Sequence, residues 1–323
     1  MKKRVGILTS GGDAPGMNAA IRAVTRAAIY GGLRVKGIYR GYRGLITDEI
    51  VEFKTQNVSN IIQAGGTILK TARCKEFTTP EGRQLAYDNL KRQEIDALVV
   101  IGGDGSLTGA RIFANEFNIP IIGLPGTIDN DIVCTEYTIG FDTAANTAVE
   151  CIDKLRDTMQ SHERCAVVEV MGRHAGYLAL YVGVAVGATA VLVPEHPYDF
   201  HSQVAEKIRH ARLNGKTNFM IVVAEGAASA VDVGRQIQEE LALDPRVTIL
   251  GHIQRGGSPT AKDRVMATRM GYEAVRILAE GKTNRVICTK DDQIIDLDID
   301  EGLAMKKTLN SEEFKVMTVM TGM

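Results

Sequence analysis

The chain of 323 residues contains no tryptophan, and aromatic residues make up only 5% of it. Proteins that bind single-stranded nucleic acid stack the bases on aromatic side chains, so this composition argues against such a role. The charges are also balanced, with 38 lysines and arginines against 39 acidic residues. Because no overall field attracts nucleic acid or an anionic membrane surface, we expect neither as a partner.

Cysteine is scarce, and its spacing matches no common metal or disulfide motif. There is no C-x-x-C pair, and no cysteine lies at metal-ligand spacing from a histidine; the five are Cys74, Cys134, Cys151, Cys165 and Cys288. Thiols of cytosolic proteins stay reduced, whereas small secreted domains carry dense cysteine frameworks. We therefore expect a cytoplasmic protein with free thiols, without disulfides or zinc.

Long hydrophobic runs are missing as well. The apolar segment after the basic N-terminal residues ends within a few residues at Ser10, which indicates a first strand rather than a signal peptide. The one long apolar stretch, Tyr177 to Val193, is interrupted by Gly183 and Gly187 and is shorter than the roughly 20 residues of a membrane span. It predicts a buried helix that leads into a strand.

Short apolar runs alternate with longer segments of helical pattern. This alternation predicts βαβ units in the α/β class, with mostly parallel strands and helices on both faces. The chain is longer than the usual single core, so we expect two domains. The expected pairs of strand and helix are 5–8 with 17–30, 97–101 with 107–117, 119–124 with 143–159, 166–170 with 174–186, 188–193 with 202–213, and 219–224 with 233–241.

Two carboxylates follow the apolar run 119–124 in the motif Pro125-Gly126-Thr127-Ile128-Asp129-Asn130-Asp131. Ligands bind at the carboxyl ends of strands in open parallel sheets, so the motif stands where a site is expected. In extended geometry Asp129 and Asp131 would face the same side, close enough for one to act as a base and the other as a metal or hydroxyl partner. Asn and Asp also favour plain turns, which is the alternative interpretation.

Glycine-rich turns follow two other expected strands. Thr9 to Asn18 contains Gly11, Gly12 and Gly16 and opens a helix, where backbone N–H groups can approach a phosphate. Gly102-Gly103-Asp104-Gly105-Ser106 surrounds one carboxylate with small residues, and Asp104 is a candidate Mg²⁺ ligand. Either segment alone also suits an ordinary tight turn, whereas strand ends that repeatedly carry Asp among small residues favour a nucleotide site.

Basic residues gather at expected strand ends in the second half of the chain. Guanidinium groups bind phosphate oxygens in pairs of hydrogen bonds, and a carboxylate binds hydroxyls, so the set indicates a phosphorylated polyol. Each residue alone is more typical of a solvated or structural position. The set comprises Arg164, Met171-Gly172-Arg173, Glu225, Arg246, His252 and Arg255, and Arg73 follows another glycine pair, Gly65-Gly66.

With these motifs the chain resembles the bacterial ATP-dependent 6-phosphofructokinases. The resemblance runs from Val5 to about Ala304. Its most specific segments are Gly11 to Asp13, Gly102 to Ser106, Pro125 to Asp131, Met171 to Arg173, and Gly251 to Gly257. Only Gly-Gly-Asp-Gly is shared widely, including with NAD and lipid kinases.

The resemblance implies transfer of the γ-phosphoryl group of MgATP to the 1-hydroxyl of fructose 6-phosphate, with Asp129 as general base and Mg²⁺ as cofactor at Asp104. Catalysis would also involve Arg73, Thr127 and Arg173. The implied ATP-binding residues are Gly11, Tyr42, Arg73, Cys74, Gly103, Asp104, Gly105 and Ser106. The implied sugar-phosphate residues are Thr127, Asp129, Asp131, Arg164, Met171, Gly172, Arg173, Glu225, Arg246, His252 and Arg255.

The family's architecture implies two Rossmann-like, three-layer α/β/α domains with the active site between them. A large ATP-binding domain would contain residues 1–140 and about 254–308, and a smaller fructose 6-phosphate domain would contain about 141–253 and 309–323. In the family, the counterparts of Arg164 and Arg246 reach the sugar phosphate from a neighbouring subunit. A homotetramer with shared active sites is therefore expected.

Regulated members of the family also bind effectors between subunits, through basic groups and a carboxylate that holds Mg²⁺. This chain keeps Arg22, Arg26, Arg156 and Lys216 of that set. Uncharged residues stand where the family carries charged ones, namely Thr55, Asn60, Thr189, Asn214, Thr217 and Asn218. We expect a remnant site with a weak response to ADP or phosphoenolpyruvate.

Other functions use part of the same motif set. A pyrophosphate-dependent phosphofructokinase would carry a larger residue at Gly105 and a lysine at Gly126. An NAD-kinase-like or lipid-kinase-like enzyme would share Gly102 to Gly105 without needing the later arginines. A sensor of sugar phosphates would keep Arg255 and Glu225 but has no use for Asp129 together with Asp104.

Overall fold

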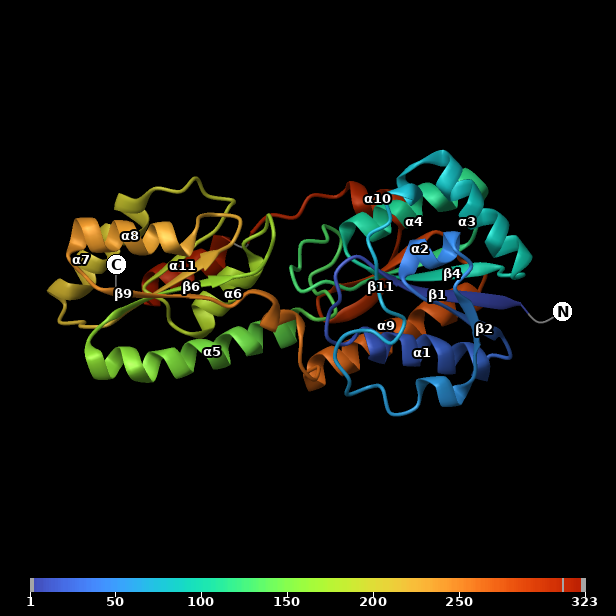
Figure 1. The fold of residues 1–323 in the computed structure, drawn as a ribbon, viewed down its shortest axis with the longest axis horizontal. Coiled ribbons are helices and arrows are strands. Elements are labelled where there is room, and N and C mark those ends of the chain that lie inside the picture. The colour runs from blue at the N-terminus through green and yellow to red at the C-terminus, as the bar shows by residue number, and fades with distance from the viewer. Residues whose placement is uncertain (1–2, 310, 321–323) are drawn as a thin grey trace. The chain divides into compact units, whose positions relative to one another are not determined.

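The computed structural model describes residues 3–309 and 311–320, so residues 1, 2, 310 and 321–323 of the expected domains lie outside the described part. The chain forms two compact units (Figure 1). Unit 1 comprises Met1–Thr127, Ile132–Thr143 and Arg255–Lys307, and unit 2 comprises Ile128–Asp131, Ala144–Gln254 and Thr308–Met323. Each contains a mostly or wholly parallel sheet between helices, which confirms the predicted α/β class.

Unit 1 is built on a seven-stranded sheet in the order β11-β10-β5-β4-β1-β2-β3. The strands from β10 to β2 run parallel, whereas β11 and β3 pair antiparallel at the two edges. The strands are β1 (Arg4–Ser10), β2 (Arg34–Ile38), β3 (Ile50–Phe53), β4 (Ala97–Gly102), β5 (Ile121–Pro125), β10 (Arg285–Lys290) and β11 (Gln293–Asp298).

Helices cover both faces of this sheet, with α1 and α9 on one face and α2, α3, α4 and α10 on the other (Figure 1). Every residue of β4 and β5 is buried, as expected for central strands that are covered on both sides. The helices are α1 (Met17–Tyr30), α2 (Gly41–Ile46), α3 (Pro80–Arg92), α4 (Asp104–Phe117), α9 (Ala261–Ala279) and α10 (Ile299–Ala304), with the 3₁₀ turns η1 (Thr55–Val58) and η2 (Glu76–Thr78).

Unit 2 contains a four-stranded parallel sheet in the order β7-β8-β6-β9. Alternate strand residues pack against α7 and α8, while α5 and α6 lie on the opposite face and α11 packs on α6 (Figure 1). The elements are β6 (Cys165–Val170), β7 (Ala190–Leu192), β8 (Phe219–Ala224), β9 (Pro245–Ile249), α5 (Phe141–His162), α6 (Tyr177–Ala185), α7 (Glu206–Leu213), α8 (Ala230–Leu241), α11 (Ser311–Met320), the π-helical turn η3 (His201–Ala205) and the 3₁₀ turn η4 (Gly251–Arg255).

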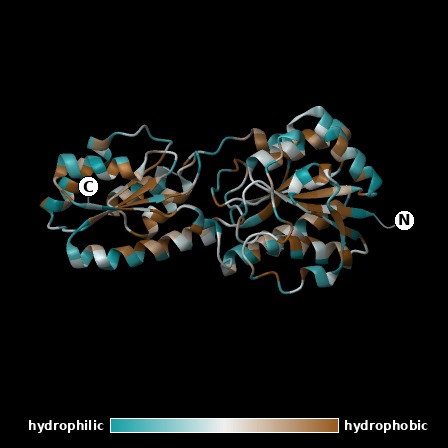
Figure 2. Cartoon of the chain, in the orientation of Figure 1, coloured by the Kyte–Doolittle hydropathy of each residue, from teal (hydrophilic) through white to brown (hydrophobic). Residues whose placement is uncertain are grey.

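Hydropathy follows this layering, because apolar residues concentrate on the strands and the inward faces of helices (Figure 2). Within the described residues, no helix combines the length and the apolar character that a membrane crossing requires. The expected helix at 107–117 starts earlier, at Asp104, so the carboxylate lies in the first turn, where the helix dipole favours a negative charge. The expected helix at 202–213 divides into η3 and α7.

Candidate active site

The first glycine-rich turn that was predicted to bind phosphate joins β1 to α1 in unit 1. Gly11 and Gly16 adopt positive φ angles of 86° and 105°, which residues other than glycine rarely adopt. The hydroxyl of Thr71 donates to the carbonyl of Gly11 at 2.6 Å. Arg255 donates from Nη1 to the carbonyl of Asp13 at 3.2 Å, so this predicted phosphate ligand lies directly over the turn. The structure thus brings Arg255 to Gly12 and Asp13 of this turn.

Asn18 at the start of α1 fixes the loop that leads to Arg73. Its side-chain amide donates to the carbonyls of Ala64 and Gly65, both at 3.1 Å, and accepts from the backbone N–H of Ile68 at 2.8 Å. Asn18 is 1% exposed, so these bonds replace the water it loses on burial. Sequence reasoning missed this residue because its partners lie far along the chain. Arg73 itself is exposed at the end of the loop.

The second turn joins β4 to α4 and carries Asp104 as the first residue of the helix. A Cβ on Gly103 would lie 3.6 Å from Cβ of Thr127, so this turn and the end of β5 are neighbours. Gly105 faces open space, with no atom within 4 Å of the Cβ position. By contrast, a Cβ on Gly126 would meet Ile101 and Met17, each at 3.1 Å, so packing explains that glycine.

Asp104 is exposed and stands without a cluster of further ligands. Among the described residues, no group of three or more His, Cys, Asp or Glu side chains is placed to hold a metal ion. Mg²⁺ keeps most of its waters and is commonly bound by one or two carboxylates together with substrate phosphates. A single exposed carboxylate at a turn suited to phosphate therefore fits Mg²⁺ that arrives with a nucleotide.

Tyr42 and Cys74 lie behind the second turn. The Tyr42 hydroxyl donates to the carbonyl of Ser106 at 2.6 Å, and its ring stacks on Phe77 with centroids 3.9 Å apart. Burial raises the pKa of Tyr42 well above its ordinary value, so the phenol stays protonated. The thiol of Cys74 contacts Glu76 at 3.5 Å, and burial raises its pKa as well. In this arrangement Tyr42 supports the loop through its carbonyl.

The turn after β5 carries the predicted catalytic carboxylate. The N–H of Thr127 donates to the carbonyl of Ile139 at 3.1 Å, and Asp129, two residues later, is 6% exposed. The expected extended geometry from Asp129 to Asp131 is wrong, because Asn130 between them has a left-handed φ of 50°. The chain therefore turns at Asn130, as the alternative interpretation of this motif had it.

In unit 2, Glu225 after β8 organises the turn after β6. Its Oε1 accepts from the N–H groups of Arg173 at 2.8 Å and Gly172 at 3.3 Å. Arg173 has a left-handed φ of 56° and Gly172 a φ of 146°, so the carboxylate holds a turn that would otherwise be unfavourable. The side chains of Arg173 and Glu225 are exposed. The structure brings these two predicted residues together.

Gln254 is a second residue that sequence reasoning missed as a site member. It is fully buried, and its Oε1 accepts from the N–H of Met171 at 2.9 Å, which fixes the start of the same turn. Its amide nitrogen has no hydrogen-bond partner among the described residues. The neighbouring His252 on η4 is exposed. The motif around η4 therefore contributes a buried amide as well as cations.

Arg164 and Arg246 lie at the other end of the unit 2 sheet. Arg164 directly precedes β6 and Arg246 stands near the start of β9, whereas Arg173 and Glu225 follow the carboxyl ends of β6 and β8. Both arginines point to Asp244, with N···O distances of 3.9 Å for Arg164 and 3.0 Å for Arg246. A strand of six residues spans about 17 Å. One chain therefore does not bring these arginines to Arg173.

Two residues of the expected effector remnant, Arg156 and Lys216, lie in unit 2. Lys216 donates to the Thr189 hydroxyl at 3.2 Å, and Arg156 donates to the carbonyl of Val186. Burial and the nearby charge of Arg156 lower the pKa of Lys216. Two cations and the Thr189 hydroxyl therefore lie close together here. Arg22 and Arg26 lie on α1 in unit 1.

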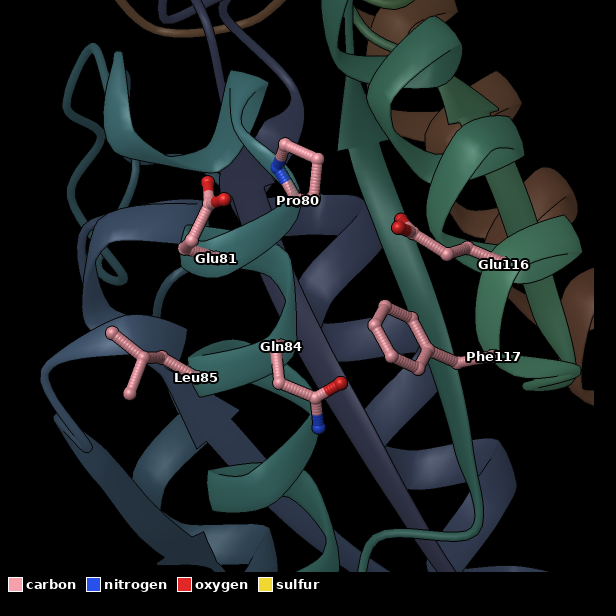
Figure 3. A pocket seen from close by; sticks show the side chains of 6 residues that line it. All are labelled: Pro80, Glu81, Gln84, Leu85, Glu116 and Phe117. Carbon is pink, nitrogen blue, oxygen red and sulfur yellow. The ribbon is translucent and has the colours of Figure 1, made fainter.

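A surface groove of about 630 Å³ lies elsewhere on unit 1, between α3 and α4 (Figure 3). None of the predicted site residues lines it. Glu116 in this groove already pairs with Arg83. The groove therefore takes no part in the candidate site; it is lined by Pro80, Glu81, Gln84, Leu85, Glu116 and Phe117.

Comparison with known proteins agrees with these motifs. The family model described as Phosphofructokinase matches residues 4–278. A protein of Bacteroides thetaiotaomicron named ATP-dependent 6-phosphofructokinase 2 is 58% identical over 318 residues, which cover 98% of this chain and 97% of that protein. A protein of a Thermoanaerobacter species named ATP-dependent 6-phosphofructokinase is 54% identical over 320 residues, 99% of each chain.

A solved structure titled phosphofructokinase from Saccharomyces cerevisiae matches with a TM-score of 0.90 and 38% identity. The match covers 99% of this chain and 48% of the yeast chain, so the present chain spans about half of that protein. The resemblance inferred from the motifs is confirmed. The chain belongs to the phosphofructokinase family.

Proposed function

We propose that this protein is an ATP-dependent 6-phosphofructokinase, which transfers the γ-phosphoryl group of ATP to the 1-hydroxyl of fructose 6-phosphate. The observation that carries the proposal is the closeness of two turns of unit 1, those after β4 and β5. A Cβ built on Gly103 would lie 3.6 Å from Cβ of Thr127. This closeness sets a turn suited to phosphate and Mg²⁺ next to the strand end that leads to Asp129. Near-full-length relatives named for this activity support the same conclusion.

Unit 1 supplies the nucleotide site in this proposal. The turns after β1 and β4 present backbone N–H groups to phosphates, and Arg73 at the end of its clamped loop pairs with phosphate oxygens. When bound, Mg²⁺ at Asp104 supplies positive charge against the β- and γ-phosphates. The residues concerned are Gly11, Tyr42, Arg73, Cys74, Gly103, Asp104, Gly105 and Ser106, in the proposed ATP-binding domain of residues 1–140 and about 254–308.

Unit 2 supplies most of the sugar-phosphate site. The turn 171–173 and the carboxylate of Glu225 bind sugar hydroxyls. His252 of unit 2 and Arg255 of unit 1 bind the 6-phosphate, as charge-assisted donors do. Thr127 and Asp131 complete the proposed contacts near the reacting hydroxyl. The proposed sugar-phosphate domain comprises about 141–253 and 309–323.

In the chemical step, Asp129 accepts the proton of the 1-hydroxyl while that oxygen forms a bond to the γ-phosphorus. The bond from this phosphorus to the bridging oxygen breaks, and the electron pair leaves with ADP. Arg73, Arg173 and the hydroxyl of Thr127 stabilise negative charge on the transferring group. General base catalysis contributes a factor of about 10² to 10⁴ to the rate.

The sugar-phosphate site is shared between subunits of a homotetramer in this proposal. Arg164 and Arg246 lie at the amino ends of β6 and β9, whereas Arg173 and Glu225 follow the carboxyl ends of β6 and β8. A neighbouring copy is therefore the source of both guanidinium groups at the 6-phosphate. Five free cysteines are consistent with action in the reducing cytoplasm.

A coupled assay with purified protein tests the proposal. We expect ADP-forming, Mg²⁺-dependent phosphorylation of fructose 6-phosphate with ATP, and at most trace activity with pyrophosphate. The open space at Gly105, which leaves room for the rest of a nucleotide, supports this preference. Pyrophosphate as the better donor would overturn the ATP assignment, and no transfer with either donor would overturn the function.

A further inference from the structure

Asp263, in the first turn of α9, is a fully buried carboxylate that takes no part in the site described above. It accepts hydrogen bonds from four donors: the hydroxyl of Tyr137, the N–H of Gly140 at 2.7 Å, the N–H of Thr143 at 2.8 Å and the hydroxyl of Thr143. Each oxygen receives two of these bonds. A buried carboxylate is costly unless its hydrogen bonds are made, and here they are.

These bonds join the starts of two helices. The N–H groups at a helix start have no partner within the helix, and Asp263 supplies acceptors to those of α5, which begins at Phe141. In return, Thr260 at the start of α9 donates its N–H to the Thr143 hydroxyl at 3.0 Å and its hydroxyl to Asp142 at 2.6 Å. The two helix starts therefore cap each other.

The segment 137–143, which Asp263 holds, is hydrogen-bonded to the turn after β5. The N–H of Ile139 donates to the carbonyl of Pro125 at 2.9 Å, and the N–H of Thr127 donates to the carbonyl of Ile139 at 3.1 Å. The hydroxyl of Thr138 donates to the carbonyl of Thr127 at 2.7 Å. Three bonds thus fix the backbone of Pro125 to Thr127, two residues before Asp129.

Close packing leaves this segment little freedom. A Cβ on Gly140 would come within 2.6 Å of Cβ of Ala14, and a Cβ on Gly16 would come within 2.7 Å of Cγ2 of Ile139. At these distances an added methyl group would clash, because a packed interior has few voids. The segment 137–140 is therefore held between Asp263 on one side and the turn after β1 on the other.

We propose that Asp263 is a positioning residue for phosphoryl transfer: through the segment 137–143 it fixes the backbone of Pro125 to Thr127 and thereby aims Thr127 and Asp129. The inference rests on the proposed function. A carboxylate is required because four donors converge on two oxygens, and an amide would turn an NH₂ group toward two of them.

The test is Asp263→Asn, assayed with ATP and fructose 6-phosphate. A misplacement of a reacting group by about 1 Å can cost about 100-fold in rate, so we expect kcat to fall roughly 10- to 100-fold. The KM values for both substrates should stay within about threefold, because the phosphate-binding groups are untouched. A kcat within twofold of wild type in this variant would overturn the proposal.

Two further variants separate positioning from stability. Leu90→Ala opens a cavity in the core of unit 1 on α3 and provides a matched loss of melting temperature; it should leave kcat nearly unchanged. Tyr137→Phe removes one of the four donors, and if Asp263→Asn does not fold it carries the test, with an expected fall in kcat of about threefold or more. A fall in kcat that tracks melting temperature equally at Leu90 and Asp263 would contradict positioning.

A double variant identifies the group that is positioned. In an Asp129→Asn background, Asp263→Asn should lower kcat by less than about threefold, because coupled residues are not additive. A full additional loss would show that Asp263 does not act through Asp129. If Asp129→Asn alone leaves kcat unchanged, the base assignment of the proposed function fails, and the kcat of Asp263→Asn in the wild-type background still decides the role of Asp263.

Discussion

The two units place their functional groups differently relative to their sheets. In unit 1 every proposed nucleotide contact follows the carboxyl end of a strand or lies on the loop that Asn18 and Thr71 hold there. In unit 2, Arg173 and Glu225 follow strand ends, but Arg164 and Arg246 stand at the opposite edge beside Asp244. In the proposed function, one chain therefore supplies all of its nucleotide site but only part of its sugar-phosphate site.

The largest expected effect tests the role proposed for Asp129. Asp129→Asn should lower kcat by about 10² to 10⁴-fold, because the base is lost while the phosphate contacts remain. The KM for fructose 6-phosphate should change little. Steady-state kinetics would check this, with the exposed Asp153→Asn on α5 as the matched control. Near-normal turnover in Asp129→Asn would remove this residue from the role of base.

The next effect concerns the remote arginines of unit 2. Arg246→Ala should raise the KM for fructose 6-phosphate by about 10- to 100-fold, since a charge-assisted hydrogen bond contributes about 1.5–3 kcal/mol. The KM for ATP should stay the same. Arg235→Ala on α8, which removes an exposed arginine paired with Asp232 at 2.8 Å, is the control. Equal changes in both KM values would place Arg246 outside the sugar-phosphate site.

A smaller effect is expected at Glu225, whose carboxylate accepts hydrogen bonds from two backbone N–H groups. Glu225→Gln keeps an acceptor for the N–H groups of Gly172 and Arg173 but loses the negative charge, so the KM for fructose 6-phosphate should rise by about tenfold or less. Glu239→Gln, on the exposed side of α8, is the matched control. If the variant changed the KM for ATP instead, the assignment of Glu225 to the sugar-phosphate site would be wrong.

The smallest effect is expected at the effector remnant around Lys216 and Thr189. Without the metal-holding carboxylate, ADP and phosphoenolpyruvate should change activity less than about twofold at sub-saturating fructose 6-phosphate, since an effector acts only through its differential affinity for two states. The titration must control for competition by ADP at the ATP site. Strong activation or inhibition at sub-millimolar effector would show that the remaining cations suffice.

Much of the site was predictable because its residues follow apolar strands in recognisable order. The buried runs of β4 and β5 and the glycines after them identify their edge of the sheet without knowledge of the fold. The strands β2, β3, β9, β10 and β11 were not predicted. Of these, β3, β9 and β11 are edge strands with mostly exposed or half-buried residues, so their pattern resembles that of loops. The internal strands β2 and β10 contain polar residues among their apolar ones, which hides their burial in the sequence.

The supporting polar residues were beyond sequence reasoning for a different reason. Asn18, Gln254 and Asp263 are buried side chains whose hydrogen-bond partners lie between about 45 and 125 positions away along the chain. Nothing in their local pattern separates them from exposed polar residues on a helix or turn. The left-handed backbone at Asn130 was likewise missed, although Asn tolerates that conformation better than most residues.

The proposal that the sugar-phosphate site is shared between subunits is tested most directly with mixed oligomers. Chains carrying Arg246→Ala and chains carrying Asp129→Asn are each impaired; after dissociation and reassembly in equal amounts, about one quarter of sites should combine an intact Asp129 with an intact Arg246 from the neighbouring copy. The predicted result is recovery of about a quarter of wild-type activity at low fructose 6-phosphate. Activity equal to the mean of the two parents, in hybrids verified by mass, would contradict a site completed by the partner.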